Sequence, residues 1–119
     1  MKEFAFSRSS RLRLKRDFEA VFDGGSRTAT GDLVAWHLRG GGEEKKLGLM
    51  VSKKTGGAVR RNRLKRLLRE AFRLDRRELK EGTRLIIYPK AGCAVGNLAQ
   101  ARKALETLRL RARLNDDGK

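Results

Sequence analysis

Residues 52–73 read S-K-K-T-G-G-A-V-R-R-N-R-L-K-R-L-L-R-E-A-F-R, and this stretch decides the predicted fold. It follows an apolar run, turns at two glycines and continues as a helix with two chemically different sides. The apolar side has a helical period and consists of Leu64, Leu67, Leu68, Ala71, Phe72 and Leu74. The opposite, cationic side consists of Arg61, Asn62, Lys65, Arg66, Arg69 and Arg73. The pattern predicts an amphipathic helix over about residues 58–74 that packs on a core.

The cationic side of this predicted helix has almost no acidic counter-charge. Glu70 is the one acid within residues 60–74. Exposed helix faces usually mix charge signs, because like charges four residues apart repel each other. Arg61, Lys65 and Arg69 nevertheless have this spacing. An ordinary solvated face is the plain alternative, but the repulsion favours an external polyanion as a partner.

The composition of the whole chain supports the same partner class. Its 119 residues suit one domain, and 30 Lys and Arg against 14 Asp and Glu give a net charge of +16. Such a charge favours nucleic acid or an anionic membrane, but no apolar run approaches the ~20 residues of a membrane span. Residues 1–10 lack the apolar segment of a signal peptide, and the lone Cys93 cannot form an internal disulfide. We therefore expect a cytoplasmic protein with no membrane partner.

The residues before the central stretch predict one helix and three strands. The helix is expected over residues 15–22, ended by Gly24-Gly25, since glycine readily adopts the left-handed conformation of a helix C-terminus. The strands are expected at residues 26–30, 33–39 and 47–53. Residues 40–46 are polar and glycine-rich, which predicts a hairpin-like connection, so we expect the second and third strands to pair.

The residues after the central stretch predict one more strand and one more helix. A ragged helical continuation to residue 80 precedes a strand at residues 83–88, which Pro89 ends. Asn97 is the expected N-cap of the last helix, with Gln100 as its capping-box partner. The stripe of this helix is Leu98, Ala101, Leu105, Leu108 and Ala112. We expect one domain over residues 1–119, with a flexible basic arm at 1–12 and a flexible tail at 115–119.

Residue types that could carry catalysis are scattered along the chain. A metal-dependent nuclease needs carboxylates that converge on cations, whereas Glu43 and Glu44 are followed directly by two lysines, as in a solvated loop. His37 has no neighbouring Asp or Ser in a known catalytic arrangement, and Cys93 has no base near it in sequence. We expect both to be structural, with no catalytic residue and no metal site in the protein.

Three aromatic residues leave two interpretations open. Phe18 and Phe22 are four residues apart on the first helix, and Trp36 lies in the middle of a strand. They can pack in the core, or they can stack on unpaired bases of a single-stranded RNA.

Residues 58–69 resemble the R-N-R signature of the bacterial ribonuclease P protein subunit. The signature, A-V-x-R-N-x-x-K-R-x-x-R, is matched at every fixed position. The flanking L-G-L-M-V-S-K-K at 47–54, E-A-F-R at 70–73 and D-F-x-x-V-F at 17–22 are similar to the family as well. The resemblance extends over about residues 11–113.

The resemblance implies a fold and an activity. The fold is α+β, an α-β sandwich of element order α-β-β-β-α-β-α with a small sheet and a left-handed β-α-β crossover, as in one domain of a small-subunit ribosomal protein. The implied activity is endonucleolytic hydrolysis that removes the 5′ leader from precursor tRNA. In the family a large RNA subunit with Mg²⁺ is the catalyst and holds most of that Mg²⁺. The protein binds this RNA and the leader, as one protein with one RNA.

The resemblance also assigns residues by position. The implied RNA-binding residues are Lys53, Lys54, Arg60, Arg61, Asn62, Arg63, Lys65, Arg66, Arg69 and Arg73, together with Arg11 and Arg13. Phe18, Phe22 and Trp36 match positions in the family's leader cleft. The family more often has Tyr or Phe at the strand position, so the contact of Trp36 stays open. Phe4 and Phe6 have no implied role.

Two other functions stay open at this point. A structural RNA-binding module, such as a ribosomal protein, fits the composition equally well and predicts no effect on cleavage of precursor tRNA. A self-sufficient nuclease would cleave RNA with no RNA subunit present.

Overall fold

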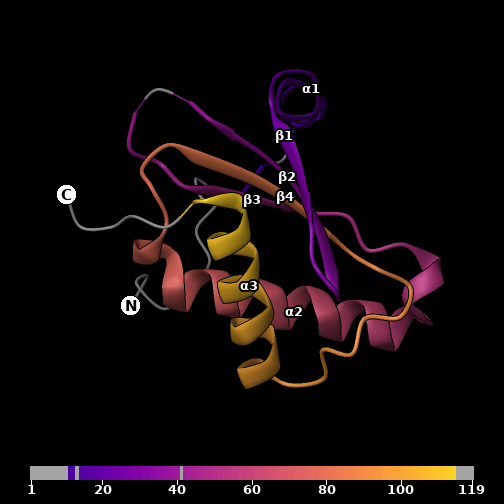
Figure 1. The fold of residues 1–119 in the computed structure, drawn as a ribbon. Helices are drawn as coiled ribbons and strands as arrows, with labels where there is room; N and C mark the ends of the chain where they lie inside the picture. Colours follow the sequence, from indigo (N-terminus) through magenta and orange to yellow (C-terminus); the bar gives the residue numbers. More distant parts are fainter. Residues whose placement is uncertain (1–10, 13, 41, 115–119) are drawn as a thin grey trace, which may run out of the picture.

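The computed structural model describes residues 11–12, 14–40 and 42–114 (Figure 1). In chain order the elements are α1 (Lys15–Gly24), β1 (Ser26–Ala29), β2 (Leu33–Arg39), β3 (Lys46–Leu49), the 3₁₀ turn η3 (Lys53–Thr55), α2 (Ala58–Asp75), the 3₁₀ turn η4 (Arg76–Glu78), β4 (Thr83–Pro89) and α3 (Leu98–Ala112). The α-β-β-β-α-β-α order is confirmed. The expected continuation after α2 is a single 3₁₀ turn, and β3 ends before η3.

The four strands form one mixed sheet in the order β1-β2-β4-β3. β2 pairs with β4 antiparallel and β3 pairs with β4 parallel, so α2 is the crossover between adjacent parallel strands. The expected pairing of residues 33–39 with 47–53 is therefore wrong, because β4 lies between these strands. The physical reason is the apolar run Leu85, Ile86 and Ile87, which is buried on both faces and so requires a central position.

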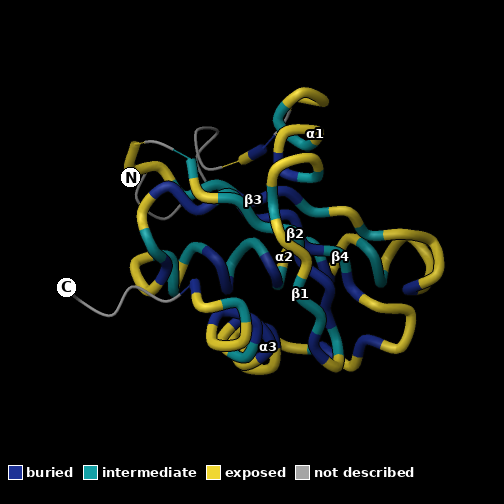
Figure 2. Tube along the Cα trace, turned by 45° about the horizontal axis from the view of Figure 1, so that its top comes forward, coloured by how far each residue is buried: buried dark blue, intermediate teal, exposed yellow. Residues whose placement is uncertain are grey.

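The sheet separates two apolar clusters. Leu85 and Ile87 of β4 belong to the larger cluster with α2 and α3, whereas Ile86 belongs to a smaller one with Val21 of α1. Figure 1 shows α1 away from α2 and α3, and in Figure 2 the strands are mostly buried or intermediate while the connecting loops are mostly exposed. The α-β sandwich is thus a central sheet with helices on both faces.

The helix α2 packs its apolar side on the larger cluster as the period predicts. Leu64, Leu68, Ala71 and Phe72 are buried, and full burial of such a side chain contributes roughly 1.5–3 kcal/mol. Leu74 is 37% exposed, so its assignment to the buried stripe is wrong. It lies at the edge of the stripe in the last turn, where the helix face has begun to turn toward solvent.

The ends of α1 and α3 differ from the sequence-based expectation in detail. Gly25 follows α1 in an extended conformation, with φ −98°, and not in the left-handed one. The sequence needs glycine there because a Cβ would lie 2.4 Å from the carbonyl oxygen of His37. Asn97 caps α3 as predicted, accepting from the Gln100 amide, but Gln100 accepts in return from Gly96.

The end of the expected basic arm is attached to the sheet. Arg11 forms a parallel bridge with Leu47, and the Leu12 amide donates to the Leu47 carbonyl oxygen at 3.0 Å. Leu12 is buried in the smaller cluster. Residues 1–10 of the expected arm, Arg13 and the expected tail at 115–119 lie outside the described residues.

Candidate RNA-binding surface and aromatic cleft

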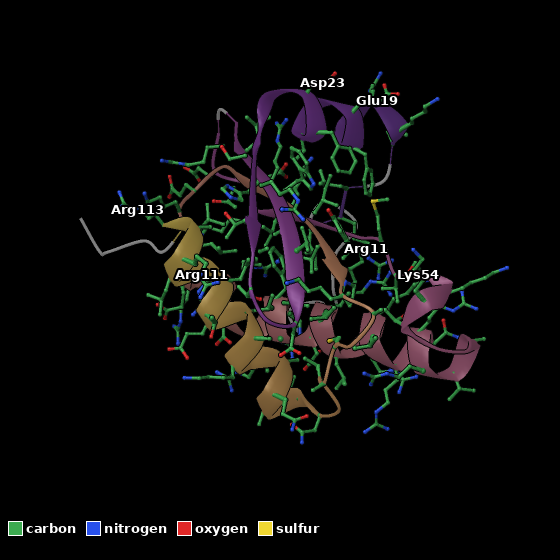
Figure 3. All side chains as sticks on the ribbon, turned by 45° about the vertical axis from the view of Figure 1, so that its right-hand side comes forward. Arg11, Glu19, Asp23, Lys54, Arg111 and Arg113 are labelled. Atoms are coloured by element: carbon green, nitrogen blue, oxygen red, sulfur yellow. The ribbon has the colours of Figure 1, made fainter. Side chains whose placement is uncertain are left out.

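The turn η3 positions the start of the cationic surface. Ser52 accepts a hydrogen bond from the Lys54 amide through Oγ and one from the Thr55 hydroxyl through its carbonyl oxygen. Gly56 then takes φ +137°, which favours glycine. Lys53 and Lys54 are exposed as a result, immediately before α2. Figure 3 shows Lys54 and Arg11 toward the same side of the molecule.

The middle of α2 presents cations to solvent together with the N-terminal segment. Asn62 and Arg66 are exposed, while Arg61, Lys65 and Arg69 are partly buried. Partial burial lowers the pKa of Arg69, and the charge of nearby Arg11 lowers it further. The fold therefore brings together two arginines that lie far apart in the sequence, which raises the positive potential of this surface.

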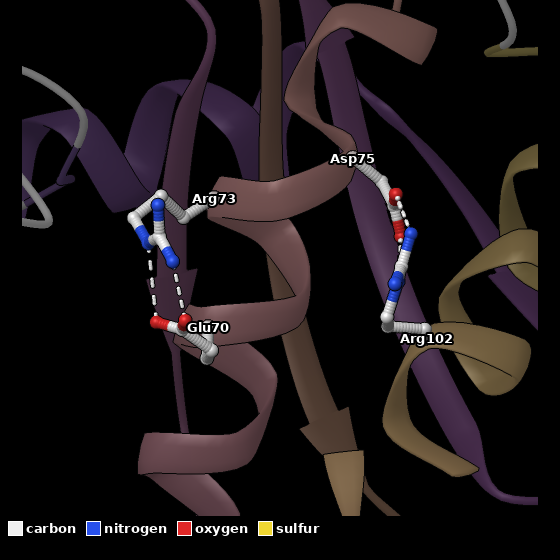
Figure 4. A network of polar contacts seen from close by, with 4 residues as sticks. All are labelled: Glu70, Arg73, Asp75 and Arg102. Carbon is white, nitrogen blue, oxygen red and sulfur yellow. Dashed lines mark hydrogen bonds and ion pairs between the residues drawn. The ribbon is translucent and has the colours of Figure 1, made fainter. Parts of the chain in front are cut away.

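Two arginines of α2 differ in how their guanidinium groups are hydrogen-bonded. The buried Nε of Arg61 has no hydrogen-bond partner among the described residues. Arg73 forms a two-point ion pair with Glu70, which lowers the pKa of Glu70, chiefly through the hydrogen bonds (Figure 4). Glu70, the one acid within residues 60–74, thus neutralises Arg73, at the C-terminal end of the surface.

Arg60 and Arg63 point their donors at the protein itself. The two terminal nitrogens of Arg60 donate to the carbonyl oxygens of Val95 and Cys93, both at 2.7 Å. Arg63 donates to the carbonyl oxygen of Gly96 at 2.8 Å. These two residues were expected among the RNA-binding residues, and the structure directs them to the loop between β4 and α3.

An aromatic cleft of about 520 Å³ lies beside η3. Its lining residues are Phe22, Trp36, Met50, Val51, Ser52, Tyr88 and Pro89. The rings of Phe22 and Trp36 meet edge to face, with centroids 5.5 Å apart and planes inclined by 74°. Two of the three residues expected in a leader cleft therefore line one cavity.

Phe18 does not line the cleft and packs over Gly48 of β3 instead. A Cβ on Gly48 would lie 2.7 Å from the Phe18 ring, so the glycine makes room for it. Phe18 belongs with the smaller apolar cluster. For this residue the core-packing alternative describes the observed contacts.

Tyr88 is a cleft residue that sequence reasoning missed. It lies two residues after Ile86, on the same face of β4. Ile86 is paired with Trp36 of β2, and Trp36 is paired in turn with Arg27 of β1. Burial raises the pKa of Tyr88, but hydrogen bonds with Trp36 and Arg27, and the charge of Arg27, outweigh it and lower that pKa. The strand alternation around Ile86 was the signal that could have found Tyr88.

The remaining candidate groups, the His37 imidazole and the Cys93 thiol, have structural environments. Thr28 Oγ1 and His37 Nε2 are hydrogen-bonded at 2.9 Å, and burial lowers the pKa of His37. Cys93 is buried, and burial raises the pKa of its thiol. Within residues 11–12, 14–40 and 42–114, no three His, Cys, Asp or Glu residues gather as metal ligands, and no helix is long and apolar enough to cross a membrane.

Comparison with known proteins agrees with the fold and with the signature. The family model for ribonuclease P matches residues 6–113. The chain belongs to the ribonuclease P protein family. The ribonuclease P protein component of Dictyoglomus thermophilum is 37% identical over 89 residues, which cover 75% of this chain and 74% of that protein.

Solved structures of ribonuclease P proteins have the same architecture. The Thermotoga maritima protein is 31% identical, with a TM-score of 0.74 over 89% of this chain and 98% of that one. The Staphylococcus aureus protein is 25% identical, with a TM-score of 0.80 over 90% of this chain and 98% of that one. Membership of the ribonuclease P protein family implies RNA binding and tRNA processing, as part of an endoribonuclease that includes the ribonuclease P RNA.

Proposed function

We propose that this chain binds the catalytic RNA of ribonuclease P through α2 and holds the 5′ leader of precursor tRNA in the aromatic cleft. One observation carries the proposal. Ser52 lines the cleft, and the next two residues, Lys53 and Lys54, begin the cationic surface. A single strand in the cleft and an RNA on α2 would therefore lie side by side.

The chemistry of the cleft suits unpaired nucleotides of any sequence. The faces of Trp36 and Tyr88 can stack on a base, and such stacking contributes ~1–3 kcal/mol per base with little dependence on base identity. Arg27, beside Tyr88, can pair with a backbone phosphate. A leader held in this way is recognised without a sequence requirement, as processing of many tRNAs demands.

The chemistry of the α2 surface suits phosphates. Each Arg or Lys that neutralises a phosphate releases counterions, so the affinity falls steeply with salt. Arginine can also grip a phosphate through two parallel hydrogen bonds, whereas lysine acts as a point charge. Arg61 and Arg66 are therefore our main candidates for contacts with the catalytic RNA.

We propose that the RNA subunit performs the hydrolysis and holds the Mg²⁺, in a cytoplasmic complex of one protein and one RNA. The two acids of α2 do not fit a metal site of their own, because Arg73 pairs with Glu70 and Arg102 pairs with Asp75. What this chain contributes is charge neutralisation at α2 and a bound position for the leader.

The test is cleavage of a precursor tRNA at low Mg²⁺ by the RNA subunit, with and without this protein. We expect the protein to increase cleavage. We also expect it to make the complex bind leader-bearing RNA more tightly than the same tRNA without a leader. Trp36→Leu should reduce this preference by about fivefold or more, since one stacking contact is lost. The matched control is Leu38→Met, in the same strand and the same apolar cluster.

The outcomes separate the candidate functions. Cleavage by the protein without the RNA subunit would indicate a self-sufficient nuclease. A protein that binds RNA but leaves cleavage unchanged would be a structural RNA-binding module, and the proposal would fail.

A further inference from the structure

Each wall of the aromatic cleft leads into a different segment, one into α2 and the other into the loop of residues 90–97. Arginine side chains of α2 connect these two segments by hydrogen bonds. On one wall, residues 50–52 lead from β3 through η3 into α2. On the other, Tyr88 and Pro89 end β4 and lead into the loop of residues 90–97 before α3. Figure 1 shows this loop passing beside the N-terminal end of α2.

The join is made by the first two turns of α2. Arg60 donates to two carbonyl oxygens of the loop, those of Val95 and Cys93, and Arg63 donates to a third, that of Gly96. Both acceptor residues of Arg60 are buried, and its own side chain is partly buried. Hydrogen bonds from a charged donor to buried carbonyl oxygens are of the stronger kind.

The other polar contacts of the loop tie it elsewhere. The Asp32 carboxylate accepts from the Ala94 amide at 3.0 Å, and the Asp32 carbonyl oxygen accepts from the Lys90 amide at 2.9 Å. These bonds attach the loop to the turn between β1 and β2. The guanidinium groups of Arg60 and Arg63 thus supply the polar connection from the loop to the N-terminal half of α2.

We propose that Arg60 and Arg63 are positioning residues that do not contact RNA. By fixing the 90–97 loop to α2, they hold the wall of the cleft at Tyr88 and Pro89 in a set position relative to the RNA-binding surface. The signature helix would then carry two kinds of cation. Arg61, Lys65 and Arg66 face the RNA, and Arg60 and Arg63 couple the two binding sites. The coupling rests on the proposed function.

The first test measures how the affinity for the RNA subunit depends on salt. Arg60→Met keeps the aliphatic stem and removes the donors, and Arg66→Met, at an exposed position of the same helix, is the matched control. We expect the slope of log affinity against log salt to be unchanged in Arg60→Met and to fall by about 0.7–0.9 in Arg66→Met. An equal fall in both variants would overturn the assignment of Arg60.

The second test uses the complex of protein and RNA subunit and measures its preference for leader-bearing over leaderless tRNA. We expect a loss of about threefold or more in Arg60→Met, typical of mutations that act on coupling, and none in Arg66→Met. Hydrogen exchange of the 93–96 amides should quicken in Arg60→Met alone. Arg60→Lys, which keeps one charged donor, should restore part of both effects.

The two proposals fail in distinguishable ways. If the wild-type complex has no leader preference, the proposed function is wrong, while the salt slope and the hydrogen exchange still test Arg60. If the wild-type preference exists and Arg60→Met keeps it with unchanged exchange, the coupling is wrong. Should Arg60→Met fail to fold, Arg60→Gln and Arg66→Gln, which remove the charge and keep a neutral donor, replace the two methionine variants in both tests.

Discussion

At the residue scale, two neighbouring glycines are expected to respond oppositely to the same substitution. A Cβ at Gly25 would lie 2.4 and 2.5 Å from backbone oxygens of His37 and Val21, whereas at Gly24 its nearest contact is 3.7 Å away on Leu38. Gly25→Ala should therefore cost more than about 2 kcal/mol of unfolding free energy. Gly24→Ala, at the last helical residue, should be neutral or stabilise by up to about 1 kcal/mol. Urea denaturation of both variants measures this, and equal midpoints would contradict it.

A second residue-scale prediction concerns the ion pair of Asp75 with Arg102, which joins α2 to α3 (Figure 4). Hydrogen bonding from Arg102 lowers the pKa of Asp75 in the folded protein. The pair therefore stabilises the fold above the ordinary Asp pKa and loses this effect as the pH falls through the lowered value. Arg102→Ala should lower the denaturation midpoint at pH 7 and leave it equal to wild type in strong acid.

The control for this pair is Lys103→Ala, which removes a looser contact with Glu106 at 3.6 Å. It should change the midpoint less at pH 7. A loss in Arg102→Ala that persists undiminished in strong acid would show that packing, and not the charge of Asp75, is responsible.

At this scale, contacts between residues close in the sequence could be predicted, and contacts between residues far apart in the sequence could not. The capping contact of Asn97 with Gln100 spans three residues, so spacing alone predicted it. The bonds of Arg60 span 33 and 35 residues, and no local pattern distinguishes a guanidinium that meets a loop from one that meets RNA. The position of Tyr88 beside Trp36 likewise required the strand register.

At the element scale, RNA binding by α2 should become less sensitive to salt when two of its RNA-facing cations are removed together. Arg61→Ala with Arg69→Ala removes two charges that lie two turns apart on one side of the helix. The slope of log affinity for the RNA subunit against log salt should fall by about 1.4–1.8, as two phosphate contacts are lost. A filter-binding titration measures the slope. An unchanged slope, with a normal circular dichroism spectrum, would place the RNA elsewhere.

The positions of helices and strands along the chain were easier to predict than the pairing of the strands in the sheet. The apolar period predicted α2 almost to the residue, and β4 was evident from its apolar run. The pairing of β2 with β3 was wrong, since residues that are adjacent in sequence were assumed to be adjacent in space. The strand that separates them, β4, enters the chain after α2, and its position depends on burial in three dimensions.

At the scale of the whole molecule, salt should act in opposite directions on stability and on RNA binding. The net charge of +16 repels itself in the compact state, and added salt screens this repulsion. The melting temperature of the free protein should therefore rise between about 0.05 and 0.5 M KCl, while affinity for the RNA subunit falls. Thermal melts followed by circular dichroism test the first half. A melting temperature that falls with KCl would contradict it.

The sheet order also has a consequence for how the chain is made. β4 lies between β2 and β3, yet it is synthesised after both and after α2. When a ribosome has released only residues 1–82, the central strand is still missing, and neither apolar cluster can close. Folding of the nascent chain is therefore expected as a late, concerted step once β4 and α3, which completes the larger cluster, have emerged. The cationic helix α2 therefore leaves the ribosome before the sheet on which it packs is complete.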